Sequence, residues 1–149
     1  MSTTTRRIAA TPEQVWSVLS DGWLYPLFVV GAARMRHVDE TWPAVGARLH
    51  HSVGAWPLMI DDTTEVLEVE GDRRILLLAR GWPAGQAHVE ITLEPDGAST
   101  SVTMVEQATA GPGALIPTPI QDVQLHARNL EALRRLAYVV EGRTGGTGR

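Results

Sequence analysis

One feature of this sequence limits its possible folds more than any other: a series of short β-strand segments followed by a single long amphipathic segment. A first strand is expected at residues 3–9, which are rich in threonine. Six more follow, separated by glycine, proline and aspartate as in an antiparallel meander. They are expected at residues 34–38, 47–53, 58–70, 73–80, 86–94 and 99–109. The pattern therefore indicates an antiparallel sheet.

Alternation of apolar and polar residues indicates which face of each strand is buried. Along residues 87–94 the odd positions are Ala, Val, Ile and Leu, whereas the even positions are His, Glu, Thr and Glu. Side chains alternate across a strand, so one face of this sheet is expected to contact water. In the last strand, the same alternation places Glu106 on the buried face with Val102 and Met104.

Three helices are expected around this sheet. Thr11 can cap a first helix with Pro12 at its first position and Gln14 completing a capping box, and residues 23–28 suggest a second short helix. Residues 120–141 form a long amphipathic segment that ends at a glycine. Its apolar face is expected to contain Val123, Leu130, Leu133, Ala137 and Val140, with Arg128 on the wet side. Residues 1–142 are expected to form one domain and residues 143–149 a disordered tail.

This order resembles the START-like helix-grip (SRPBCC) superfamily, in particular its polyketide cyclase/dehydrase and lipid transport group. The resemblance rests on residues 8–16 (IAATPEQVW), 45–49 (VGARL), 64–69 (TEVLEV), 73–77 (RRILL), 97–104 (GASTSVTM) and 128–136 (RNLEALRRL). It implies an α+β helix-grip fold, in which one long C-terminal helix covers the concave face of a seven-stranded curved antiparallel sheet. It also implies a pocket for a small hydrophobic molecule, although the superfamily includes both enzymes and carriers.

Composition excludes several classes of function. The chain has 149 residues, of which 44% are hydrophobic, a net charge of −4 and no cysteine. Disulfides, thiolate metal sites and a thiol nucleophile are therefore excluded, and the acidic balance disfavours nucleic-acid binding. No segment has the length of a membrane span, and no apolar signal core follows the N-terminus. We expect a soluble cytoplasmic protein, monomeric or homodimeric, with no cofactor, because phosphate-cradling glycine motifs are missing.

Tryptophans are the first candidates for the walls of a ligand pocket. The chain contains five, with only one Phe and two Tyr, so most of its large aromatic surface is indole. Trp16 lies within a predicted helix and is expected in the core. The other four flank predicted loops, where a ring can border a cavity mouth; simple packing is the alternative for each. These four are Trp23, Trp42, Trp56 and Trp82.

Polar candidates are few. Glu106 is the preferred carboxylate inside the pocket, beside Met104; the alternative is a strand-end residue that reaches solvent. His50 and His51 are adjacent in a strand and point to opposite faces, so His51 is a candidate for the pocket but the two cannot share a metal. His88 and Glu90 share a face of their strand, but this face is expected to contact water and no third ligand is matched with them, so no metal site is expected.

His126 and Asn129 lie near the apolar face of the long helix and are further candidates for the pocket. A histidine satisfied at the boundary is the alternative for His126. Three functions follow in order of preference: a carrier or sensor of a lipid-like or polyketide-like molecule; a cyclase or dehydrase in which Glu106 moves protons; and a protein that binds a partner through an exposed strand or helix. No catalytic motif is matched.

Overall fold

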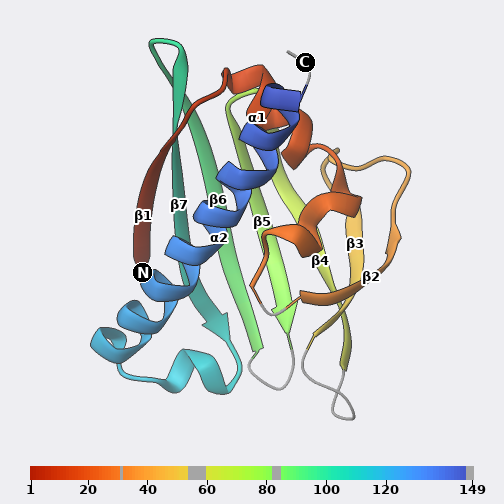
Figure 1. The fold of residues 1–149 in the computed structure, drawn as a ribbon. Helices are drawn as coiled ribbons and strands as arrows, with labels where there is room; N and C mark the ends of the chain where they lie inside the picture. The colour runs from red at the N-terminus through yellow and green to blue at the C-terminus, as the bar shows by residue number, and fades with distance from the viewer. Residues whose placement is uncertain (31, 54–59, 82–84, 147–149) are drawn as a thin grey trace.

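The structure, a computed structural model, describes residues 1–30, 32–53, 60–81 and 85–146 and has the predicted α+β helix-grip architecture (Figure 1). A long helix crosses one face of a sheet, and two smaller helical segments lie beside its upper half. The elements are β1 (Ser2–Ile8), α1 (Pro12–Leu19), the 3-10 helix η1 (Gly22–Leu27), β2 (Ala32–Val38), β3 (Arg48–Val53), β4 (Ile60–Glu70), β5 (Arg74–Gly81), β6 (Gly85–Asp96), β7 (Ser99–Ala110), the 3-10 helix η2 (Pro112–Leu115) and α2 (Thr118–Gly146).

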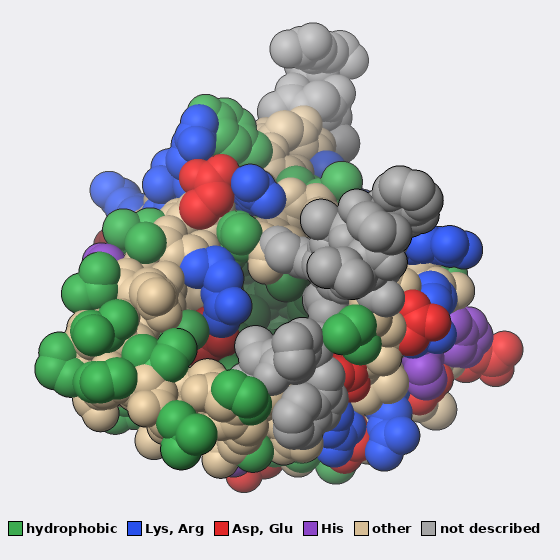
Figure 2. Space-filling model, turned by 90° about the horizontal axis from the view of Figure 1, so that it is seen from below, with side chains coloured by type: hydrophobic (Ala, Val, Ile, Leu, Met, Phe, Trp, Pro, Cys, Tyr) green, Lys and Arg blue, Asp and Glu red, His purple; other side chains and the backbone are tan. Residues whose placement is uncertain are grey.

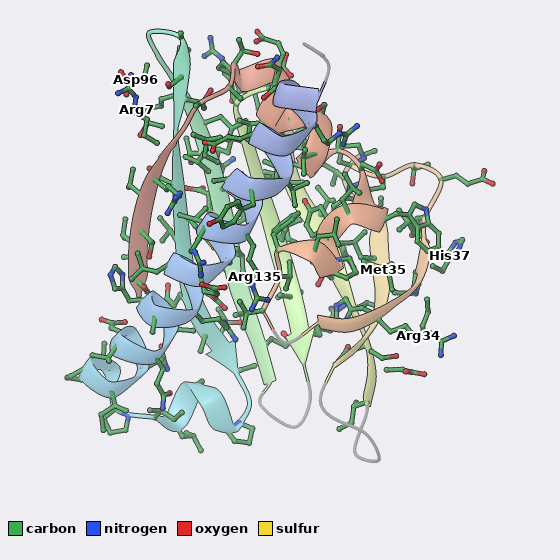
Figure 3. All side chains as sticks on the ribbon, viewed as in Figure 1. Arg7, Arg34, Met35, His37, Asp96 and Arg135 are labelled. Atoms are coloured by element: carbon green, nitrogen blue, oxygen red, sulfur yellow. The ribbon has the colours of Figure 1, made fainter. Side chains whose placement is uncertain are left out.

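The seven strands form one antiparallel sheet in the order β1-β7-β6-β5-β4-β3-β2. The first strand thus pairs with the last, with Ser2 opposite Glu106 and Ile8 opposite Thr100. An ion pair of 3.2 Å between Arg7 and Asp96 lies at the end of this pairing, beside the β6–β7 hairpin (Figure 3). The meander therefore ends beside the strand with which the chain begins.

Local sequence explains where the strands turn. The β4–β5 turn places Asp72 at a φ of 62°, and the β6–β7 hairpin places Gly97 at 61°, a region that aspartate and glycine tolerate. Gly85 begins β6 at a φ of 116°, where a Cβ atom would lie 2.0 Å from the carbonyl oxygen of Ala110. Only glycine allows β6 to start this close to the end of β7.

The predicted capping box of α1 is confirmed. The Thr11 hydroxyl accepts from the Gln14 backbone N–H at 3.2 Å, and the Gln14 side chain accepts from the Thr11 N–H at 2.8 Å. The apolar face of the helix is fully buried against the sheet and α2 through Val15, Val18 and Leu19. Burying three such side chains contributes on the order of 5 kcal/mol.

The two halves of α2 are packed differently. Its C-terminal half is buried through Leu133, Leu136 and Val140, none of which is more than 1% exposed. In its N-terminal half, Val123 is 70% and Leu130 is 49% exposed, so the prediction that these two residues belong to the buried face is wrong. The reason is that the sheet-facing side of this half borders a cavity and carries polar residues instead.

The end of α2 also differs from the expectation. The helix continues past Gly142 to Gly146, so residues 143–146 are helical where a disordered tail was expected. The Thr144 hydroxyl donates to the Glu141 carbonyl at 3.1 Å within this last turn, which supports the extension. Among the described residues, no helix has both the length and the hydropathy that crossing a bilayer requires.

Candidate functional site

A cavity of about 630 Å³ lies between the concave face of the sheet, η1 and the N-terminal half of α2. Seen from below, a hollow with hydrophobic side chains at its floor opens on the surface (Figure 2). The sheet contributes most of the apolar wall, because many of the lining side chains on its strands are aliphatic or sulfur-containing. They include Met35, Leu49, Leu77, Val89, Ile91 and Met104. A volume of this size lies within the range of small-molecule sites.

Aromatic side chains of η1 form the opposite wall. Tyr25 and Phe28 line the cavity, with ring centroids 4.8 Å apart. Tyr25 is buried and donates its hydroxyl to the Leu19 carbonyl at 3.0 Å, and burial raises its pKa well above the ordinary value. Trp42 packs edge-on against Tyr25 from behind and donates its indole N–H to the same carbonyl at 3.3 Å. This wall is therefore held in place by hydrogen bonds outside the cavity.

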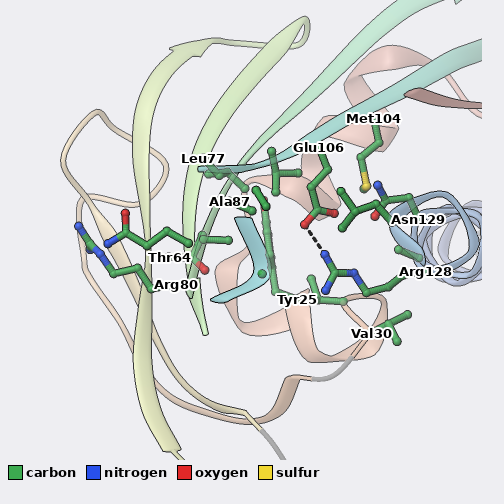
Figure 4. Close-up of a pocket in the computed structure, with 18 of the residues that line it drawn as sticks. Tyr25, Val30, Thr64, Leu77, Arg80, Ala87, Met104, Glu106, Arg128 and Asn129 are labelled. Atoms are coloured by element: carbon green, nitrogen blue, oxygen red, sulfur yellow. Dashed lines mark hydrogen bonds and ion pairs between the residues drawn. The ribbon is translucent and has the colours of Figure 1, made fainter. Parts of the chain in front are cut away.

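An ion pair crosses one end of the cavity. Arg128 of α2 donates from Nη2 to Oε2 of Glu106, which points inward from β7 (Figure 4). Glu106 is 4% exposed, whereas the Arg128 side chain is 44% exposed. The carboxylate is therefore shielded from bulk water, whereas the guanidinium group still contacts the solvent. A carboxylate this deeply buried requires such a partner.

His51 lies in the wall formed by β3 and β4. Its Nε2 is 2.9 Å from the hydroxyl oxygen of Thr64, and its Nδ1 is buried without a hydrogen-bond partner. Burial lowers the pKa of His51, and the positive charges of Arg36 and His50 add to this against the opposing effect of Asp62. The neighbouring His50 points to the other face of the sheet, where it contacts Asp39 at 2.9 Å. The ring of His51 is therefore favoured in its neutral form.

Asn129 points from α2 toward the sheet, facing Met104 and Glu106 (Figure 4). Its side chain is 2% exposed, and its amide nitrogen Nδ2 has no hydrogen-bond partner. A polar amide on the buried side of an amphipathic helix is unusual unless it is hydrogen-bonded. Asn129 thus provides a polar atom next to the cavity whose bonding is incomplete.

The nine residues expected from sequence lie in different places. His51, Met104, Glu106 and Asn129 all line the cavity. Trp23 is 55% exposed on η1, and Trp42 belongs to the core behind Tyr25. His126 faces the other side of α2, where its Nδ1 is 3.1 Å from the hydroxyl oxygen of Thr4. Trp56 and Trp82 lie outside the described residues.

Most of the lining residues were not candidates from the sequence, and the three that matter most for the chemistry of the site are Tyr25, Phe28 and Arg128. The first two lie in the predicted second helix, whose short, proline-broken pattern gave no periodic face. Arg128 was placed on the wet side of its helix, and its side chain is indeed partly exposed, yet it reaches Glu106. One sequence signal could have identified Arg128: it is adjacent to the pocket candidate Asn129. A long arginine side chain can extend over neighbouring surface and so reach the same site.

The described residues contain no group of three or more His, Asp or Glu side chains that could hold a metal ion. The arrangement can instead bind an apolar molecule, supply hydrogen bonds at a few points and, through Glu106, exchange a proton. These three capacities limit the functions that the site supports.

Comparisons with known proteins agree with this geometry. The family model described as polyketide cyclase/dehydrase and lipid transport matches residues 2–141. No curated protein matches the sequence. Among solved structures, NE0264 from Nitrosomonas europaea is similar with a TM-score of 0.73 at 15% identity, covering 96% of this chain and 95% of that one. A conserved protein from Geobacillus kaustophilus has a TM-score of 0.70 at 17% identity, covering 94% of each chain.

A third similar structure, Ara h 8.0201, has a TM-score of 0.69 at 12% identity, covering 94% of this chain and 96% of that one. At these identities the three structures establish a shared fold and carry no residue roles. The helix-grip architecture is therefore common to proteins of widely different sequence.

The ion pair between Glu106 and Arg128 leads to a stability prediction. Replacing Arg128→Met keeps the apolar stem but leaves the buried carboxylate unpaired, so the free energy of unfolding is expected to fall by about 1–3 kcal/mol in urea denaturation. Arg134→Met is the matched control on the same helix, because Arg134 pairs with Glu131 at the exposed surface and its loss is expected to change stability little. Equal losses in both variants would contradict the assigned role of the pair.

The buried histidine leads to a pH prediction. Because the pKa of His51 is lower in the folded protein than its value of about 6.5 in the unfolded chain, the unfolded chain binds the proton first as the pH falls. The free energy of unfolding is therefore expected to decrease between about pH 7 and pH 5, and less steeply in His51→Gln. His88 is exposed, so His88→Gln is the control and should show the same pH dependence as the wild type. If the free energy of unfolding of His51→Gln falls with pH in parallel to the wild type, His51 does not contribute to the pH dependence.

Proposed function

The chain belongs to the polyketide cyclase/dehydrase and lipid transport family, and from this premise we propose that it binds a small lipid-like or polyketide-like molecule in its internal cavity, as a carrier or a sensor. The observation that carries the proposal is the cavity of about 630 Å³ beneath α2, whose walls are mainly aliphatic and aromatic. Protein interiors are otherwise close-packed, so a space of this size with apolar walls is a natural site for a small apolar molecule.

The energetics favour an apolar occupant. A ligand that buries about 300 Å² of apolar surface gains on the order of 7 kcal/mol before the costs of association are subtracted. Charged side chains among the described lining residues are limited to Arg80, Glu106 and Arg128, and the last two neutralise each other. Most of the binding energy is therefore expected from apolar contact, with orientation set by the few polar groups.

The proposed setting is the cytoplasm, with the protein as a monomer or a homodimer. The lack of cysteine in all 149 residues means that the fold needs no disulfide and therefore no oxidising compartment.

A second candidate function is catalysis of the cyclase or dehydrase type, favoured by one observation: a carboxyl group, Glu106, is buried in the cavity wall. In ring closure of a polyketone, Glu106 would take a proton from the carbon between two carbonyls. That carbon would attack a distant ketone carbon, and the protonated Glu106 would return its proton to the resulting alkoxide. Water would then leave as the hydroxyl group departs with a proton, while Glu106 takes the remaining proton from the attacking carbon and a carbon–carbon double bond forms. His51 is the other proton-exchanging side chain in the cavity wall, whereas His126 lies elsewhere on α2.

Binding is tested with N-phenyl-1-naphthylamine, an uncharged apolar dye that fluoresces in dry sites. We expect saturable binding of one dye per chain. Ala87→Trp places a ring in the cavity and is expected to weaken binding about tenfold or more, whereas His88→Trp adds the same ring on the exposed face of β6 and should leave it unchanged. No saturable signal, or equal effects of both variants, would refute cavity binding.

Catalysis is tested with Glu106→Gln, which keeps the shape of the side chain and removes its ability to accept a proton. If the protein is a cyclase, turnover of a linear polyketone should drop by about 100-fold or more, the scale of general acid–base catalysis, while the affinity for N-phenyl-1-naphthylamine stays within about threefold. Unchanged turnover in this variant would remove the proposed catalytic role. Absence of turnover in the wild type would leave the carrier or sensor as the function.

A further inference from the structure

Two polar atoms with incomplete bonding belong to residues of the cavity wall. Among the described residues, three buried side-chain atoms lack a hydrogen-bond partner: Ser2 Oγ, His51 Nδ1 and Asn129 Nδ2. Two of the three therefore belong to residues that line the cavity. Folded proteins rarely leave buried donors or acceptors unpaired, so each such atom requires an explanation. A ligand that provides the missing partners is one explanation that both residues share.

The two residues lie on opposite sides of the cavity. Asn129 projects from α2 next to β7, whereas Thr64, the hydrogen-bond partner of His51, is drawn at the far side of the pocket (Figure 4). β3, which carries His51, is four strands away from β7. Because neighbouring strands are about 4.8 Å apart, the two polar points are separated by on the order of 10–20 Å. The space between them is bordered by apolar side chains such as Leu77 and Met104.

The chemistry of each point restricts what can bind there. The Asn129 amide donates through Nδ2 and lies beside Glu106, whose charge is already neutralised by Arg128. No unpaired positive charge is described at this point to bind an anionic ligand group, so it suits an uncharged oxygen acceptor. The amide turns about a torsion with a broad energy profile, so directing it into the cavity costs little. At the other point, Nδ1 of His51 is buried, so a rotation of the imidazole ring is needed to bring it to the cavity. It then donates or accepts according to the tautomer, and a hydroxyl group can satisfy either.

We infer that the occupant of the cavity is an elongated molecule with an apolar middle and an uncharged oxygen function at each end, a carbonyl or hydroxyl bonded to Asn129 and a hydroxyl bonded to His51. The inference rests on the proposed binding function and adds the class of ligand to it. It assigns the two residues as determinants of specificity and of orientation, since two separated polar points allow a rod-shaped molecule only one alignment.

Three rod-shaped probes test the inference: trans-stilbene, 4-hydroxystilbene and 4,4′-dihydroxystilbene, each used to displace N-phenyl-1-naphthylamine from the wild-type protein. Affinity is expected to rise with each hydroxyl group, by up to about tenfold per group. Apolar burial alone predicts the reverse order, because each hydroxyl makes the probe more polar. Equal or decreasing affinity along the series would overturn the inference and leave cavity binding standing, whereas failure of the dye itself to bind would overturn both.

Matched variants assign the two ends. Asn129→Leu and His51→Phe are each expected to lower the affinity for 4,4′-dihydroxystilbene about tenfold while leaving the affinity for trans-stilbene within about twofold. Met104→Leu reshapes the same cavity without removing a polar atom, so it should change the three affinities by one common factor. If Asn129→Leu and His51→Phe also changed all three affinities equally, the residues would shape the cavity rather than recognise oxygen. The order of the three probes on the wild type tests the inference even if a variant fails to fold.

Discussion

One long helix, α2, covers most of the concave face of the sheet. The rest of the structure depends on how this helix packs against the strands. Seven curved strands present more apolar surface than one helix can contact along its whole length. The C-terminal half of α2 meets α1 and the sheet through Leu133, Leu136 and Val140, all essentially inaccessible to solvent. This packed half fixes the helix, and it allows the other half to stand away from the sheet. The cavity is the consequence of that division.

Polar groups occupy the half of α2 that stands away. Arg128 and Asn129 face the cavity there, where an ordinary amphipathic helix would present leucine or valine. Glu106 of β7 forms an ion pair with Arg128, so the buried carboxylate has a partner of opposite charge. His51 and Asn129, by contrast, each have one buried nitrogen atom without a hydrogen-bond partner. The site therefore combines a neutralised ion pair with two incomplete hydrogen-bonding groups in an otherwise apolar space, which favours orientation of a ligand over strong electrostatic attraction.

Periodicity predicted the strands well because each strand of this sheet has one wet face. The alternation along β6 predicted that Ile91 and Leu93 are buried and that His88 is exposed, and the structure confirms this. Periodicity was misleading on α2, where Val123 and Leu130 have helical spacing with the core residues yet are largely exposed. A hydrophobic pattern indicates which residues resemble core residues. It does not indicate the distance between the helix and the sheet that it packs against. Tyr25 of η1 and Phe28, which follows it, were missed because a short 3-10 helix has too few turns to show a face.

The order of elements, the antiparallel meander, the cap of α1 and the inward direction of Glu106 could all be predicted from the residues alone, because they depend on local propensities and on the alternation of side chains along one strand. Three contacts could be found only in the folded chain: Arg128 with Glu106, Trp42 behind the aromatic wall, and His126 with Thr4. Each of these depends on the distance and rotation of α2 and η1 relative to the sheet. Those quantities arise from the packing of the whole core at once, and no window of sequence contains them.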